Sequence, residues 1–125
     1  MMLITNPVFT EVEKSYLEFV LQLDFQGKST VIDQLNTMNT SDITRDITPH
    51  YWIMEFRPNG MNAGHGPMHP YVRFEVIHES EIPSTVFTLY ERNGVVFELE
   101  IFNADSSAMD LDAIMDGNVY FSDCR

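Results

Sequence analysis

The four histidines of this chain are its nearest approach to a metal-binding pattern. His65 and His69 have three residues between them in the segment 59–70, and His50 and His78 lie on the two predicted strands that this segment joins. Several imidazoles could converge near one end of a sheet, so His65 and His69 are candidate metal ligands. However, the glycines and prolines of the segment break helical spacing, and metal sites usually include carboxylate or thiolate ligands in fixed geometry.

Other catalytic patterns are weak. Glu98 and Glu100 share a predicted strand face as the paired carboxylates of a glycosidase would, but solvated glutamates on an outer face are the commoner explanation. The aspartates between residues 105 and 116 do not follow the order of a calcium loop, and Cys124 has no assignable general base. The motifs of nucleophile elbows, phosphate-binding loops and zinc proteases are missing from the sequence. We therefore predict neither an enzyme nor a cofactor.

Charge is the strongest global feature. The 125 residues include 19 Asp and Glu against 7 Lys and Arg, for a net charge of −12. This field repels nucleic acid phosphates and anionic lipid headgroups, so we expect neither a nucleic-acid binder nor a membrane protein. It favours a basic protein partner, although an acidic composition also serves solubility alone. The lone Cys124 and the lack of a secretory signal predict a cytoplasmic location.

The centre of the predicted fold is a β-hairpin in residues 85–104. Two alternating runs of β-branched and aromatic residues flank Asn93-Gly94, which readily forms a two-residue type I′ turn. The turn places Tyr90 opposite Phe97. The expected core face contains Val86, Thr88, Tyr90, Val95, Phe97, Leu99 and Ile101, and the expected exposed face contains Phe87, Leu89, Glu91, Val96, Glu98, Glu100 and Phe102. A four-residue loop would keep these faces, and a bulged three-residue loop would exchange them.

Two amphipathic helices are predicted ahead of the strands. Asn6 and Pro7 are suited to the N-cap and first position of the first helix, and Gly27 to its end. Ser29 then caps a second, shorter helix. Both helices carry apolar residues at three- and four-residue spacing, which is typical of a face packed on a core.

Further strands are predicted at residues 50–57 and 71–79, with a polar connection at 39–48. Residues 118–122 form either a short edge strand or a docked tail. The predicted class is α+β, in one domain of residues 1–125. It has two N-terminal helices packed on one face of a four- to five-stranded antiparallel sheet, a meander with the first strand as an edge partner.

Two segments carry a resemblance. LDFQGKSTVIDQL contains Leu23, Asp24, Phe25, Gly27, Gln34 and Leu35, and FELEIFNADSSAMD contains Glu98, Leu99, Glu100, Ile101, Phe102, Asp105 and Ser107. They resemble the signature stretches of a family of short bacterial proteins of unknown function, in which Asp-Phe, often Pro, and Gly end the first helix and a Glu-Leu-Glu-Ile-aromatic strand leads into Asp-Gly-Ser. Here Gln26 replaces the proline and Ser106 the glycine. The resemblance implies a small cytoplasmic bacterial protein without known activity.

These observations support two functional hypotheses. The first is a non-enzymatic protein-binding module, similar in size and charge to toxin-immunity proteins, which contacts a basic partner through acidic residues on the sheet. The candidate contacts are Glu75, Glu79, Glu91, Glu98 and Glu100. The alternative is a small-ligand or metal-binding domain, with or without enzymatic activity, that has its site at His65 and His69. We expect a monomer or a weak homodimer, because strand 51–57 resembles an exposed edge but has a proline near each end.

Overall fold

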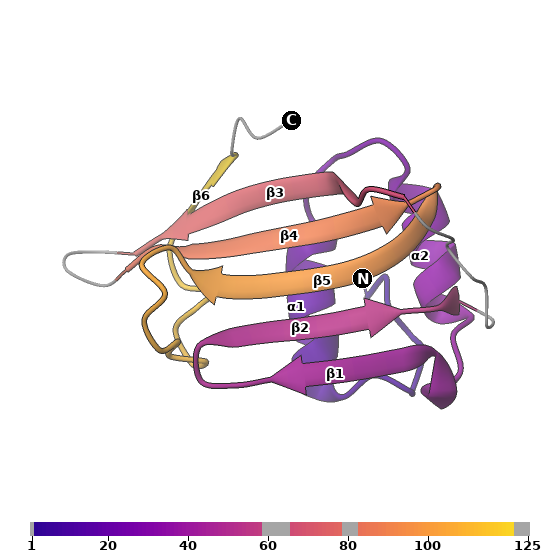
Figure 1. Ribbon diagram of the computed structural model, residues 1–125, viewed down its shortest axis with the longest axis horizontal. Coiled ribbons are helices and arrows are strands. Elements are labelled where there is room, and N and C mark those ends of the chain that lie inside the picture. Colours follow the sequence, from indigo (N-terminus) through magenta and orange to yellow (C-terminus); the bar gives the residue numbers. More distant parts are fainter. Residues whose placement is uncertain (1, 59–65, 79–82, 122–125) are drawn as a thin grey trace.

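The computed structural model describes residues 2–58, 66–78 and 83–121, of Phe121 only the backbone. Six strands form one antiparallel sheet in the order β1-β2-β5-β4-β3-β6 (Figure 1). The elements are α1 (Glu11–Leu21), α2 (Lys28–Asn36), a short 3-10 helix (Thr40–Asp42), β1 (Ile43–Ile47), β2 (Tyr51–Phe56), β3 (His69–Ile77), β4 (Thr85–Arg92), β5 (Val95–Asn103) and β6 (Asn118–Phe121). The α+β class and the antiparallel sheet are confirmed, with more strands than the expected four to five.

The additional strand is β1, in the segment that we interpreted as a polar connection. Only Ile43 is buried in this strand, and its other four residues are exposed, so the strand has no alternating apolar pattern to reveal it. It pairs with β2 along its whole length, from Ile43 opposite Phe56 to Ile47 opposite Trp52. As a result β2 lies inside the sheet, and β1 and β6 are its edges. The interpretation of strand 51–57 as an exposed edge is therefore wrong.

The N-terminal cap of α1 is Thr10, not Asn6. The Thr10 hydroxyl accepts from Glu13 N–H at 3.1 Å, and the Glu13 carboxylate accepts from Thr10 N–H at 2.8 Å. This is the capping box that the Thr-x-x-Glu spacing permits. The Asn6 side chain instead donates to the carbonyls of Leu35 and Met38, which ties the N-terminal segment to the end of α2.

Glu13 also joins α1 to the edge of the sheet. Its carboxylate forms an ion pair with Arg45 of β1, and a second hydrogen bond from Arg45 Nη2 measures 2.9 Å. Burial acts to raise the pKa of Glu13, but the Arg45 guanidinium and the Thr10 N–H hold it below its usual value. The pair ties β1 to α1, and removing Arg45 would leave the buried Glu13 carboxylate without its counter-ion.

The Asn93-Gly94 turn is confirmed, with φ values of 53° and 78°, but the pairing beyond it differs from the prediction. Glu91 lies opposite Val96, and Tyr90 lies opposite Glu98, so β5 carries one extra residue at this point. This is a β-bulge, and a shift of one residue exchanges the faces of everything beyond it. Tyr90, predicted opposite Phe97, therefore faces Glu98 instead.

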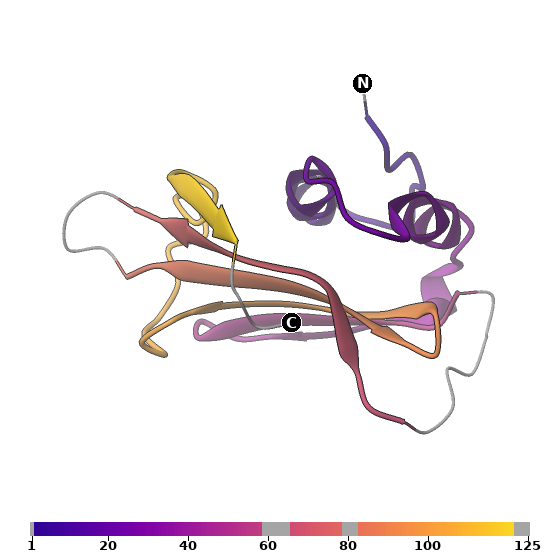
Figure 2. The same cartoon turned by 90° about the horizontal axis from the view of Figure 1, so that it is seen from above.

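The bulge decides which side chains enter the core. Phe87 and Leu89, predicted on the exposed face, are opposite Ile101 and Leu99 and are buried with them. Aromatic rings then build the core between the helices and this face. The ring centroids are 4.7 Å apart for Tyr16–Trp52, 5.3 Å for Phe19–Phe87 and 5.1 Å for Phe74–Phe87. Figure 2 shows α1 and α2 on this same side of the sheet.

The other side of the sheet is called the open face. Because paired residues share a face, the register of the six strands arranges it in three rows. Across the sheet, the rows are Thr44-Glu55-Glu98-Tyr90-Pro70, Asp46-Ile53-Glu100-Thr88-Arg73, and Tyr51-Phe102-Val86-Glu75-Tyr120. Within the described residues, no helix lies over these rows (Figure 2). Neither α1 nor α2 has the length and apolar character that crossing a membrane requires.

Gly27 is the N-cap of α2, where Ser29 was predicted. Its φ of 88° is left-handed, and a Cβ there would approach the Tyr71 ring to 3.0 Å. At Gly94, with a φ of 78°, a Cβ would meet nothing within 4 Å. Both positions therefore favour glycine by conformation, but only Gly27 is also restricted by a neighbour.

We predict that Gly27→Ala lowers the free energy of unfolding by roughly 2–3 kcal/mol and that Gly94→Ala, the matched control, lowers it by about 1 kcal/mol. The difference between the variants isolates the contact with Tyr71. Urea unfolding monitored by tryptophan fluorescence measures both. Equal losses would show that the Tyr71 ring moves aside without cost.

Candidate functional site

Three carboxylates meet near the middle of the open face. Glu55 of β2 is directly opposite Glu98 of β5, and Glu100 is two residues further along the same face of β5. The Cβ atoms of directly opposed residues lie about 4.5–5.5 Å apart, a distance at which like charges destabilise a sheet. None of the ion pairs found among the described residues includes any of the three.

Glu98 is the most perturbed of these groups. Its exposure is only 8% although it lies on the open face. Its pKa is raised to about 7, first by burial and then by the charges of Glu100 and Glu55, with Arg92 acting in the opposite direction. Near neutral pH the side chain is thus close to evenly divided between its neutral and charged forms. A nearby cation would shift this balance toward the carboxylate.

Two side chains next to the carboxylates, Arg92 and Tyr90, leave the negative charge of the cluster largely unneutralised. The Arg92 guanidinium lies 4.0 Å from the centre of the Phe97 ring, in a cation–π contact, and Arg92 Nε has no hydrogen-bond partner among the described residues. The Tyr90 hydroxyl donates to Glu100 Oε1 at 3.4 Å. Burial and the Glu100 charge both raise the pKa of Tyr90, which keeps its proton available for this bond.

A hollow of about 340 Å³ opens beside the carboxylates. We call it the Glu100 hollow. Its lining consists of His50, Tyr51, Ile53, Glu100, Phe102 and Ser106. His50 Nδ1 lies 3.1 Å from the Ser106 carbonyl, which ties the turn before β2 to the loop after β5. Two aromatic side chains and one carboxylate therefore share a concave site on the open face.

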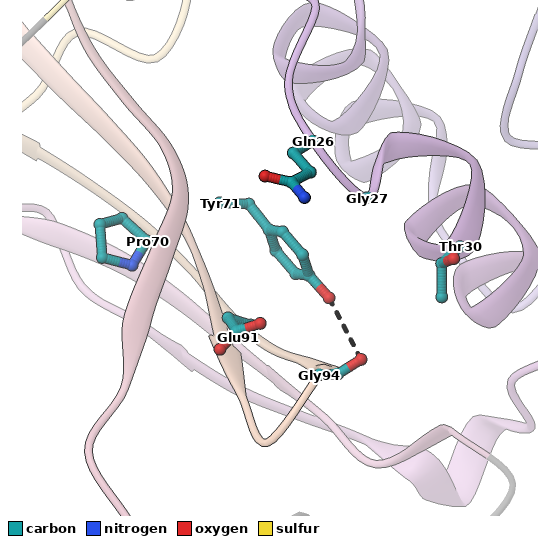
Figure 3. A pocket seen from close by; sticks show the side chains of 7 residues that line it. All are labelled: Gln26, Gly27, Thr30, Pro70, Tyr71, Glu91 and Gly94. Atoms are coloured by element: carbon teal, nitrogen blue, oxygen red, sulfur yellow. Dashed lines mark hydrogen bonds between the residues drawn. The ribbon is translucent and has the colours of Figure 1, made fainter. Parts of the chain in front are cut away.

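A second hollow, of about 470 Å³, lies between the start of α2, β3 and the hairpin turn (Figure 3). The Tyr71 hydroxyl donates to the Gly94 carbonyl at 3.3 Å across it, and the Glu91 side chain lies on the same wall. The N–H groups at the start of α2 favour an anion, but the Glu91 carboxylate disfavours one.

The structure divides the predicted contact residues. Glu75, Glu98 and Glu100 share the open face, but Glu98 is buried and not the exposed contact that we expected. Glu91 is opposite the buried Val96 and lies on the other side of the sheet because of the bulge. Glu79 lies outside the described residues.

Glu55 could not be recognised as part of the cluster from the sequence alone. Its position depends on the pairing of β2 with β5, two strands that are separated by more than thirty residues along the chain. Local alternation can place Glu55 on one face of its own strand, but it gives no information about the residue opposite. A sequence signal for such a pair would require knowledge of the register between distant strands.

The histidines are spread over the sheet. His69, at the start of β3, is exposed and opposite Glu91 near the hairpin turn. His50 and His78 lie at the other end, since His50 precedes β2 and His78 follows β3. His65 lies outside the described residues. Where the structure describes the chain, no three His, Cys, Asp or Glu side chains are placed to hold a metal ion.

Comparisons with known proteins return nothing. No protein-family model, curated protein or solved structure matches this chain. The resemblance of two segments of the chain to a bacterial family therefore stays a prediction, and the open face is the feature from which a function can be proposed.

We predict that Glu98→Gln stabilises the protein in a pH-dependent manner. Below pH 4.5 the Glu98 carboxyl is protonated in both folded and unfolded states, so the variant and parent should be similar. As pH rises from 4.5 to about 7, the unfolded parent ionises while the folded parent stays protonated, so the parent loses stability. Above pH 8 the variant should be more stable by roughly 1–3 kcal/mol.

Thermal and urea unfolding between pH 4 and 9 measure this difference. Glu75→Gln makes the same change of charge elsewhere on the open face and serves as the control. A stability difference for Glu98→Gln that does not vary with pH would contradict the assignment.

Proposed function

We propose that this chain is a non-enzymatic protein-binding module whose open face binds a basic protein, the mode of action of a toxin-immunity protein. The single observation that carries the proposal is the desolvated Glu98 carboxyl beside Glu55 and Glu100. Keeping carboxylates together in this way costs stability, since Glu98 can lose its proton only against burial and two like charges. A partner that supplies cations converts this cost into binding energy.

The composition of the open face also suits an interface. Partly exposed aromatic and aliphatic side chains, including Tyr51, Ile53 and Phe102, lie among the carboxylates, and Tyr120 at the β6 edge is 54% exposed. Tyrosine and phenylalanine are enriched where proteins bind one another, because they contribute a large area at small entropic cost. Such a face offers both apolar contact and charge complementarity.

The overall charge acts at longer range. With a net charge of −12, the chain attracts a basic protein before contact, which raises the association rate and makes it dependent on salt. Cations placed against Glu98 would then act after contact, in a partly desolvated site where screening by salt is weaker. The proposal therefore separates a long-range contribution of the whole surface from a short-range contribution of the carboxylate cluster.

We predict that the open-face variant Glu55→Lys/Glu75→Lys captures much less of a basic partner than the parent. Asp24→Lys/Asp33→Lys makes the same change of net charge on exposed residues of the helix side and is the matched control. The test is quantitative affinity capture from lysate of the native host, with each recovered protein titrated against both variants and against salt. Capture should fall at least tenfold for the open-face variant and weaken as salt rises.

Equal losses for both variants would show that only net charge matters and would reject the open face as the binding site. An affinity that is indifferent to salt would reject a basic partner. Both variants must retain the thermal stability of the parent within a few degrees for the comparison to apply.

The alternative, a metal or small-ligand site at His65 and His69, has its own test. We predict that added zinc or nickel leaves the melting temperature unchanged, because the described His69 is exposed and lies at the opposite end of the sheet from His50 and His78. The variant His65→Ala/His69→Ala is the control. A metal-dependent rise in the parent that the double variant lacks would favour the alternative, since a ligand bound only to the folded state stabilises it.

A further inference from the structure

We propose that the Glu100 hollow is a subsite for an arginine side chain of the basic partner, with the guanidinium between the Tyr51 and Phe102 side chains and paired with Glu100. This inference rests on the proposed function and specifies the chemistry of the contact. Its volume of about 340 Å³ is at the lower end for ligand pockets, which suits a single side chain.

The register of β2 and β5 builds the hollow. Tyr51 is directly opposite Phe102, and Ile53 is directly opposite Glu100, so two adjacent cross-strand pairs present two aromatic side chains, one aliphatic side chain and one carboxylate. A guanidinium is planar, stacks on aromatic faces and pairs with a carboxylate through two parallel hydrogen bonds. An ammonium lacks both the plane and the bidentate geometry, so the arrangement favours arginine over lysine.

The polar groups of the hollow and its rim are predominantly hydrogen-bond acceptors. The Tyr51 hydroxyl donates to the Asp46 carboxylate at 3.3 Å, so a second carboxylate lies at the rim. His50 Nδ1 must donate to the Ser106 carbonyl, because a carbonyl only accepts, so Nε2 of the neutral ring is an acceptor. A ligand that suits this set brings donors and positive charge, and the guanidinium carries five N–H donors.

Tyr51 and Glu100, one aromatic wall and the carboxylate of the hollow, each have a hydrogen-bond partner within the fold. The Tyr51–Asp46 bond fixes the end of the Tyr51 side chain against β1, and the Tyr90 hydroxyl bonds to Glu100 from the other side. Ser106 has a φ of 64°, and its carbonyl receives the His50 bond in that conformation. A preformed site loses less entropy on binding than one that must be ordered.

The test is an NMR titration of the full chain with N-acetyl-arginine-amide, and with N-acetyl-citrulline-amide as a neutral analogue of nearly the same shape. We expect millimolar binding of the arginine probe, with the largest shifts at the amides of Ile53, Glu100 and Phe102. Citrulline should shift them far less, and the lysine analogue should bind more weakly than arginine.

Variants assign the contacts. Glu100→Gln should weaken arginine binding at least fivefold, and Tyr51→Leu about two- to fivefold. Asp33→Asn, an exposed residue of α2 on the helix side and outside the hollow, should leave it unchanged. Amide spectra that match the parent away from the substitution establish that each variant is folded.

Equal shifts with arginine and citrulline, shifts centred outside the hollow, or no shifts at all would overturn the subsite. None of these outcomes would reject the proposed function, because the Glu55→Lys/Glu75→Lys capture experiment changes residues outside the hollow. Conversely, arginine binding with capture that ignores those two residues would keep the subsite and reject the wider open face.

Discussion

One constraint determines both faces of this sheet, namely the bulge where Tyr90 and Glu91 of β4 meet β5. Between the Asn93-Gly94 turn and the bulge, the two strands pair regularly. On the far side of the bulge, from Tyr90 back to Thr85, each residue of β4 shares a face with the neighbour of the β5 residue that a regular ladder would place opposite it. The same extra residue places Phe87 in the aromatic core and Tyr90 beside Glu98. Core packing and the acidic cluster therefore have a common geometrical origin.

The energetic balance between the two faces explains how such a cluster is tolerated. The core face buries a continuous set of rings and aliphatic side chains from both helices and from the inner strands, which supplies most of the stability. The open face then carries Glu55, Glu98 and Glu100 at a cost that is small beside that gain. Protonation of Glu98 reduces this cost in the free protein. A bound cation would reduce it in a complex.

Local signals allowed much of the fold to be predicted. The Asn-Gly turn, the helical periodicity and the alternating strands gave the class, the antiparallel sheet and its central hairpin. The edge strand β1 could not be predicted, because four of its five residues are exposed. Three of these four are polar, and the fourth, Ile47, does not form an alternating apolar pattern with Ile43 that would indicate a strand. Thr10 displaced Asn6 as the helix cap because Asn6 has partners near the end of α2, and such tertiary contacts leave no local trace.

The candidate site was predictable only in part. Glu98 and Glu100 are two residues apart on a strand, so their common face follows from the sequence. The placement of Glu91 on the other side depends on a bulge that no glycine marks, and the pairing of Glu55 with Glu98 depends on two strands that are distant in the chain. The perturbed pKa of Glu98 follows from those two long-range facts.

The most direct test of this account is the titration of the Glu98 carboxyl, followed by its ¹³Cδ chemical shift from pH 3 to 10. The account predicts a midpoint near 7, well above the ordinary value of 4.5, because the group is desolvated and lies beside two other carboxylates. A midpoint close to 4.5 would show a solvated glutamate. The acidic cluster would then be an ordinary charged surface, and the central argument for a cation-binding face would fail.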